Sequence, residues 1–198
     1  MIMKKGTIVL LSVLGALLLL VVVCVSTYNG LVSKEESVSE KWGAVESVYQ
    51  RRADLIPNLV NTVKGYATHE QSTLQAVTEA RSRATSINID PATATPEQME
   101  AWMKAQEELS SALGRLIAIS ENYPDLKASQ NFLALQSQLE GTENRISVER
   151  QNYNAVVKEY NVAVRRFPSN IIASMFGFEK KTMFEAQAGA EVAPVVQF

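Results

Sequence analysis

An uncharged run of nineteen residues, Thr7–Val25, most constrains how this chain can fold. Lys4 and Lys5 precede it, and Leu and Val supply most of the run itself. A helix of this length, rising about 1.5 Å per residue, extends roughly 28 Å and so matches the hydrocarbon core of a bilayer. We therefore predict a short basic N-terminus over residues 1–6, a transmembrane anchor over residues 7–25, and a water-soluble domain beyond it.

A cleaved signal peptide is the alternative interpretation of this run. Signal peptides have apolar cores of about 7 to 15 residues and a small-residue cleavage site. This run is longer, and no Ala-x-Ala pattern follows it, although a cut after Ser26 is conceivable. Cys24 does not indicate a lipoprotein, because Val23 stands where a small residue is usual. We favour an uncleaved, single-pass anchor.

Basic residues around the run bear on its orientation. Lys4 and Lys5 lie before it, and Lys34 and Lys41 are the nearest basic residues after it. The excess of basic residues on cytoplasmic flanks favours a cytoplasmic N-terminus and an extracytoplasmic soluble domain, and the cytoplasmic location of that domain stays the alternative.

Charge and cysteine content restrict the partners of the soluble part. The chain has a formal net charge of −2, and setting aside Lys4 and Lys5 leaves −4. This balance argues against nucleic acid, or an anionic bilayer surface, as the main partner. Cys24 is the only cysteine, so no intramolecular disulfide can form.

Residues 33–85 carry a 3.5-residue heptad repeat of seam residues, the pattern of a helix packed in a bundle or coiled coil. The seam residues are Val38, Trp42, Val45, Tyr49, Arg52, Ile56, Leu59, Val63, Tyr66, Glu70, Thr73 and Val77. A capping-box pattern at residues 33–36 precedes them. Because the repeat keeps its phase through Pro57 and Gly65, we expect one long helix bent at Pro57. A helical hairpin near Pro57 or Gly65 is the alternative.

The remaining pattern predicts two more long helices. After a loop at residues 86–95, Thr95 is expected to cap a helix with Pro96 in its first position and Gln98 completing a capping box. That helix ends near Pro124, and a third runs from about residue 126 to 167.

A short apolar segment, residues 171–178, follows the third helix, and residues 179–198 are expected to be a loosely ordered tail. The turn at Pro124 makes the second and third helices antiparallel neighbours. The predicted fold class is all-α: one N-terminal transmembrane helix, then an elongated antiparallel bundle of three long helices plus a short C-terminal helix.

The course of the first helix decides where residues 171–178 lie. With one continuous first helix, the third helix ends far from the anchoring bilayer. With a broken first helix, its end returns towards that bilayer. The segment is expected to pack back on the bundle, and binding to a partner or a membrane surface is the alternative.

Three sequence clusters, taken together, carry a family resemblance. They are residues 49–70, with Tyr49-Gln-Arg-Arg-Ala-Asp-Leu-Ile-Pro-Asn at their start; residues 121–128, Glu-Asn-Tyr-Pro-Asp-Leu-Lys-Ala; and residues 135–161, with Tyr153-Asn154 and Tyr160-Asn161. This combination resembles the LemA family of bacterial membrane proteins, and the likeness covers residues 28–178. The resemblance implies an anchored helical bundle in the bacterial cell (inner) membrane, and it implies no settled biochemical activity.

No constellation in the sequence predicts catalysis, a cofactor or a metal. His69 is the only histidine, and di-iron bundles need further histidine ligands, while zinc sites need several nitrogen or sulfur ligands. No Gly-x-Ser-x-Gly or phosphate-loop pattern occurs. A metal-dependent enzyme using His69 and nearby carboxylates is kept only as an alternative.

Polar residues on or beside the seam are the candidate structural or interaction residues. Arg52 lies on the apolar seam, where a charge needs a partner across the interface. The polar stripe on the third helix could supply it, and we expect Arg52→Ala to leave a buried carboxylate unpaired. The set comprises Arg51, Arg52, Asp54, Asn58, Glu143, Asn144 and Arg145.

Tyr153-Asn154 and Tyr160-Asn161 stand one heptad apart and share a face. We expect the tyrosines to fill core and the asparagines to bond across to the first helix near Asn58 and Asn61. A partner-binding stripe is the alternative.

These features favour a non-enzymatic, membrane-anchored scaffold or interaction protein. Its expected partners are the lipid bilayer, through residues 7–25, and a protein partner or a second copy of the chain. A lipid- or membrane-organising oligomer is the alternative function.

Overall fold

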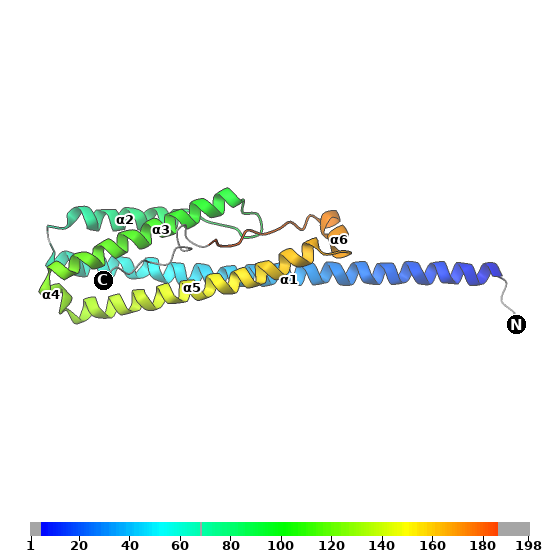
Figure 1. Cartoon of the computed structure of the whole chain (residues 1–198), viewed down its shortest axis with the longest axis horizontal. Helices are drawn as coiled ribbons and strands as arrows, with labels where there is room; N and C mark the ends of the chain where they lie inside the picture. Colours follow the sequence, from blue (N-terminus) through cyan, green and yellow to red (C-terminus); the bar gives the residue numbers. More distant parts are fainter. Residues whose placement is uncertain (1–4, 68, 186–198) are drawn as a thin grey trace, which may run out of the picture.

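The computed structural model describes residues 5–67 and 69–185, and every regular element in them is helical (Figure 1). The all-α fold class predicted from the sequence is confirmed. In chain order the elements are α1 (Lys5–Tyr66), α2 (Gln71–Ser86), α3 (Pro96–Ile119), the 3-10 turn η1 (Ser120–Asn122), α4 (Pro124–Lys127), α5 (Gln130–Arg165) and α6 (Ser169–Phe176).

Helix α1 has 62 residues and changes environment along its length. Its first part projects alone beyond the bundle (Figure 1). The most apolar 18 residues of this part have a mean hydropathy of 3.3, and none of them is buried by the rest of the described chain. Burial begins at Leu31, which is 2% exposed. The apolar run and the first bundle helix are thus one continuous helix, so the capping-box pattern at residues 33–36 lies inside a helix and starts none.

The expectation of one helix over residues 33–85 is wrong. Helix α1 passes through Pro57 but ends at Tyr66, directly after Gly65, and α2 packs back against it. The intervening residues 67–70 amount to about one helical turn of chain, so the seam keeps its spacing while the direction reverses. Both helices bury their seams in the same core, Val63 from α1 and Val77 from α2.

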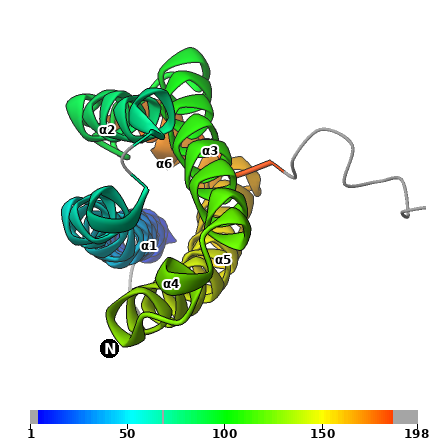
Figure 2. The same ribbon diagram turned by 90° about the vertical axis from the view of Figure 1, so that its left-hand side faces the viewer.

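The start of α3 follows the predicted chemistry. The hydroxyl of Thr95 accepts a hydrogen bond from the Gln98 backbone N–H at 3.2 Å, the Gln98 side chain accepts one from the Thr95 N–H at 3.0 Å, and Pro96 is the first helical residue. This capping box is confirmed. Helix α3 packs mainly on α2, beside which it lies in Figure 2, whereas α5 packs mainly on α1. The backbones of α3 and α5 are therefore less closely paired than expected.

Apolar side chains gather in two clusters along the bundle. The cluster nearer the anchor contains Trp42, Trp102 and Tyr160. The cluster at the far end contains Leu59 and Phe132. Buried Arg52 lies between them on α1, after Tyr49 of the first cluster and before Ile56 of the second.

The C-terminal end of α5 returns to the anchor, as the broken-helix alternative required. Helix α6 lies beside α1 (Figure 1), where the ring of Tyr28 is 4.8 Å from that of Phe176. Ile172 and Ala173 are buried against the bundle, which confirms that this segment packs back, while Ile171 on the same helix is 50% exposed.

Residues 179–185 are not loosely ordered, contrary to expectation. The side-chain amide of Asn154 exchanges two hydrogen bonds of 2.8 Å with the backbone of Phe184. Asn161 does the same with Lys181, at 2.9 Å for both bonds. Phe184 is 6% exposed and stacks on Trp42. The two asparagines therefore bind this segment rather than α1. The rest of the predicted tail, residues 186–198, lies outside the described residues.

Candidate functional site: a polar groove over Arg52

Arg52 is the largest fully buried side chain among the described residues, at 1% exposure. Its Nη1 donates to Ser110 Oγ at 2.7 Å and to Glu143 Oε1 at 2.9 Å. Its Nη2 donates to the side-chain and backbone oxygens of Gln106, at 2.6 and 3.3 Å. Arg52 thus joins its own helix α1 to α3 and α5.

Gln106 extends this layer to a fourth helix. Its side-chain amide donates to the Ala84 carbonyl of α2 at 3.0 Å, and the residue is 8% exposed. A buried guanidinium is tolerated because most of its donors meet acceptors. Nε of Arg52 is the exception: it is buried and has no hydrogen-bond partner among the described residues.

The carboxylate that pairs with Arg52 is not buried, contrary to expectation. The Glu143 side chain is 43% exposed against 2% for that of Arg52. Water therefore screens one end of this ion pair and would solvate Glu143 if Arg52 were removed. Loss of Arg52 would instead leave the buried side-chain oxygen of Gln106 without its hydrogen-bond donor.

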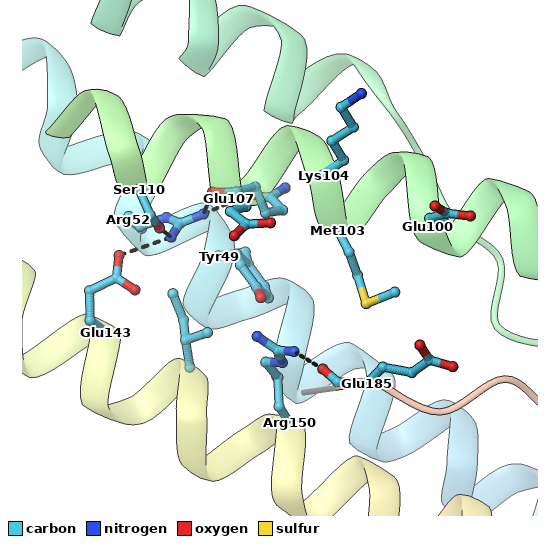
Figure 3. Close-up of a pocket in the computed structure, with 12 residues that line it drawn as sticks. Tyr49, Arg52, Glu100, Met103, Lys104, Glu107, Ser110, Glu143, Arg150 and Glu185 are labelled. Carbon is cyan, nitrogen blue, oxygen red and sulfur yellow. Dashed lines mark hydrogen bonds and ion pairs between the residues drawn. The ribbon is translucent and has the colours of Figure 1, made fainter. Parts of the chain in front are cut away.

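An open groove of about 460 Å³ lies over this layer, between α3 and α5 (Figure 3). Residues 179–185 close one end of it, where Arg150 donates to the Glu185 carbonyl at 3.0 Å and stands 4.8 Å from the ring centroid of Phe184. The lining residues are mostly polar and carry both signs of charge: Tyr49, Arg52, Glu100, Met103, Lys104, Gln106, Glu107, Ser110, Glu143, Ile146, Arg150 and Glu185.

Tyr49 stands where the groove meets the core. It is 8% exposed, its ring lies 5.0 Å from the Arg52 guanidinium carbon, and it packs edge-on against Trp102. Burial raises the pKa of its hydroxyl, and the nearby Arg150 and Arg52 charges oppose that rise only in part. The hydroxyl is therefore protonated at neutral pH and available as a donor.

The remaining polar residues singled out from the sequence do not join this layer. Arg51, Asp54, Asn58, Asn144 and Arg145 are all exposed. Asp54 accepts a hydrogen bond from Gln50 of the same helix at 2.8 Å.

Tyr153 and Tyr160 lie in the anchor-side core, at 1% and 0% exposure. The Tyr153 hydroxyl donates to the Thr182 carbonyl at 3.2 Å, and that of Tyr160 to Glu35 at 3.4 Å. Burial raises the pKa of Tyr153 to about 12, and burial together with the Glu35 carboxylate raises that of Tyr160 further.

Sequence reasoning missed several groove residues. Gln106 carried a usable signal, because it follows Trp102 by four residues and precedes Leu109 by three, and a polar side chain on such an apolar seam needs a partner. Ser110 follows one helical turn later. Arg150 and Glu185 carried no signal in the sequence, because their contact depends on the path of residues 179–185.

His69 lies outside the groove and is exposed, while its neighbour Glu70 accepts a hydrogen bond from the Tyr123 hydroxyl at 3.1 Å. Over residues 5–67 and 69–185, no group of three or more His, Cys, Asp or Glu side chains is placed to hold a metal ion. The groove itself offers hydrogen-bond donors, acceptors and charges of both signs to a polar binding partner.

Comparisons with known proteins agree on one family. The model of the LemA family matches residues 41–198. Magnetosome protein MamQ 2 of Paramagnetospirillum magneticum is 26% identical over 186 residues, which are 85% of this chain and 68% of that relative. Magnetosome protein MamQ of Magnetospirillum gryphiswaldense is 25% identical, covering 98% of this chain and 78% of the relative. Protein LemA of Metamycoplasma hominis is 24% identical, covering 83% and 71%.

These relatives are bacterial, and the N-terminal apolar helix of this chain is consistent with membrane anchoring. The family match covers all three sequence clusters that carried the resemblance and the bundle from residue 41 onward. The chain belongs to the LemA family.

Proposed function

We propose that this protein is a membrane-anchored, non-catalytic helical scaffold that docks another protein through the groove over Arg52. One observation carries the anchor: α1 leaves the bundle as a bare apolar helix, with none of its most apolar window buried by the rest of the described chain. Such a surface is stable in hydrocarbon and not in water.

The docking part of the proposal rests on the groove. Its walls come from three helices and from Glu185, at the end of residues 179–185. Acidic and basic side chains both line the groove, which is open to solvent. A polar, pre-formed cleft of this kind suits a protein segment that brings its own hydrogen-bonding groups.

The anchor is tested by extraction. The full chain, expressed in bacteria, should remain in the pelleted membranes after an alkaline carbonate wash. Recovery in the supernatant would contradict a transmembrane anchor.

Orientation is tested with a Ser33→Cys variant carrying Cys24→Ala. Ser33 is exposed just past the apolar run. The basic flank before that run supports an extracytoplasmic domain. An impermeant thiol reagent should then label the variant once the outer barrier is opened, and labelling only after the inner membrane is opened would place the domain in the cytoplasm.

The groove is tested by photocrosslinking in living cells. A benzophenone amino acid replaces Met103 in the groove, and in a control it replaces Val148, which is exposed outside it. The Met103 probe should give a discrete adduct that Glu107→Lys weakens and Glu140→Lys, outside the groove, leaves intact. Equal adducts from both probes, or insensitivity to Glu107→Lys, would contradict docking in the groove.

A membrane-organising oligomer is the second candidate function. It is favoured by the names of two relatives, which are magnetosome proteins. In this case the Met103 probe should capture only another copy of the chain, and the full chain should form larger assemblies on lipid vesicles than in detergent.

A further inference from the structure

Four apolar side chains at the anchor end of the bundle are left open. They are Phe167, Ile171, Met175 and Phe176, exposed by 76%, 50%, 72% and 59%, and we name them the α6 patch. Ile171 and Met175 lie four residues apart and therefore share one face of α6, and Phe167 stands two residues before the helix begins. Contiguous exposed apolar side chains of this size mark a binding surface.

The patch lies level with the end of the apolar run of α1. The Tyr28 ring is 4.8 Å from the ring of Phe176 and 5.6 Å from that of Phe178. Tyr28 follows Val25, the last residue of the run, by three positions, or about 4.5 Å along a helix. Because α1 is unbroken there, the patch has a set height relative to the proposed span (Figure 1).

The faces of α6 divide as in an interfacial helix. Ile172 and Ala173 are buried against the bundle, Asn170 and Ser174 form an exposed polar face, and the α6 patch is exposed and apolar. Helices of this kind lie at a membrane surface with their apolar face about 5–10 Å into the boundary of headgroups and acyl chains.

The residues around the patch suit lipid headgroups. Arg165 and Arg166, at the end of α5, are exposed and form no ion pair within the described part of the chain. Guanidinium groups at this height can bind headgroup phosphates, and a tyrosine such as Tyr28 is typical of the membrane–water interface.

We infer that the α6 patch inserts into the interface of the same bilayer that α1 spans, giving the bundle a second point of membrane contact. This inference rests on the proposed anchor. The occupant is lipid rather than another protein because the unbroken α1 brings the patch to the bilayer surface whatever else is bound. The second contact restrains the bundle from tilting about the single span.

Collision accessibility of spin labels tests the inference. The full chain with Cys24→Ala is reconstituted in phosphatidylcholine vesicles, with and without phosphatidylglycerol, and labelled at single cysteines. Met175→Cys probes the patch, Ser174→Cys the neighbouring polar face, and Val148→Cys the middle of α5. Leu18→Cys, at a position 71% exposed in the apolar run, probes the span.

The Met175 label should have an oxygen-to-nickel-chelate collision ratio several-fold above that of Val148, clearly above that of Ser174, and below that of Leu18, because the patch reaches the interface and Leu18 lies deeper in the span. Adding Ile171→Ser should move the Met175 label towards water. A Met175 label as open to the nickel chelate as Val148, with Leu18 still in lipid, would overturn the inference and leave the anchor intact. Protection from both reagents would indicate a protein contact and would also overturn it. A Leu18 label in water would refute the anchor instead.

Discussion

Replacing Arg52 with methionine tests whether the polar layer stabilises the bundle. Methionine keeps much of the buried volume and removes the charge, so little cavity is left. The buried side-chain oxygen of Gln106 loses its donor, which costs about 1–3 kcal/mol for an unpaired buried acceptor. Ser110 and Glu143 are partly exposed and recover hydrogen bonds from water. We therefore expect Arg52→Met to lower the free energy of unfolding by about 1–3 kcal/mol.

Two companion variants sharpen this expectation. Arg52→Ala adds a cavity and should lose about 3–5 kcal/mol. Arg51→Met removes an arginine that is next in the chain but exposed, so its effect should stay within about 0.5 kcal/mol.

Urea unfolding of the full chain in detergent micelles, followed by the fluorescence of Trp42 and Trp102, measures these differences. A double-mutant cycle with Glu143→Gln should give a coupling of about 1 kcal/mol, because the carboxylate is 43% exposed. Equal stabilities of the Arg52→Met and Arg51→Met variants would refute the reasoning.

Three further predictions concern the anchor-side half of the bundle. Burial raises the pKa of Tyr153 to about 12 from an unfolded value of about 10, so the folded state holds this proton more tightly than the unfolded state. The resulting stabilisation of the fold is complete below pH 10 and is lost as the pH rises from 10 through 12. Tyr153→Phe should therefore reduce the fall of the melting temperature over that pH range. Asn154→Ala should speed amide hydrogen exchange at Phe184, whose backbone it binds, whereas Asn152→Ala, an exposed neighbour, should not. Gly177→Ala should lower the free energy of unfolding in urea by about 1 kcal/mol, because φ is +76° at this residue, a backbone conformation that alanine adopts with strain. No atom lies within 4 Å of the added Cβ, so no steric clash contributes, and an unchanged urea midpoint would refute backbone strain as the cause.

The sequence predicted the helices well because their seams are strongly periodic. The apolar run ending at Val25, the capping box at Thr95 and the reversal at Pro124 each depend on local chemistry, and local chemistry is legible in a sequence. The break after Tyr66 was not predicted, because the short connection between α1 and α2 preserves the heptad spacing of the seam. Gly65 was the one residue that indicated this break, and a helical hairpin near it was the alternative interpretation.

The candidate site was predictable only in part. A charge on an apolar seam made Arg52 conspicuous, and Glu143 was among the partners considered. The structure brings those two together but leaves Asn144 and Arg145 exposed. Which side of α5 meets α1 depends on packing over the whole bundle, and no local pattern encodes it. The same holds for Asn154, whose partner is a segment with no periodicity of its own.

The central claim is that the chain reverses after Tyr66 and therefore brings the end of α5, with α6, back to the anchored end of α1. A dipolar distance between spin labels at Asn29→Cys and Ser174→Cys, in the full chain with Cys24→Ala and in lipid vesicles, tests it most directly. The account predicts a short distance, because the rings of Tyr28 and Phe176 are 4.8 Å apart. A distance of roughly 55 Å or more, the length of α1 beyond the label at 1.5 Å per residue, would contradict it.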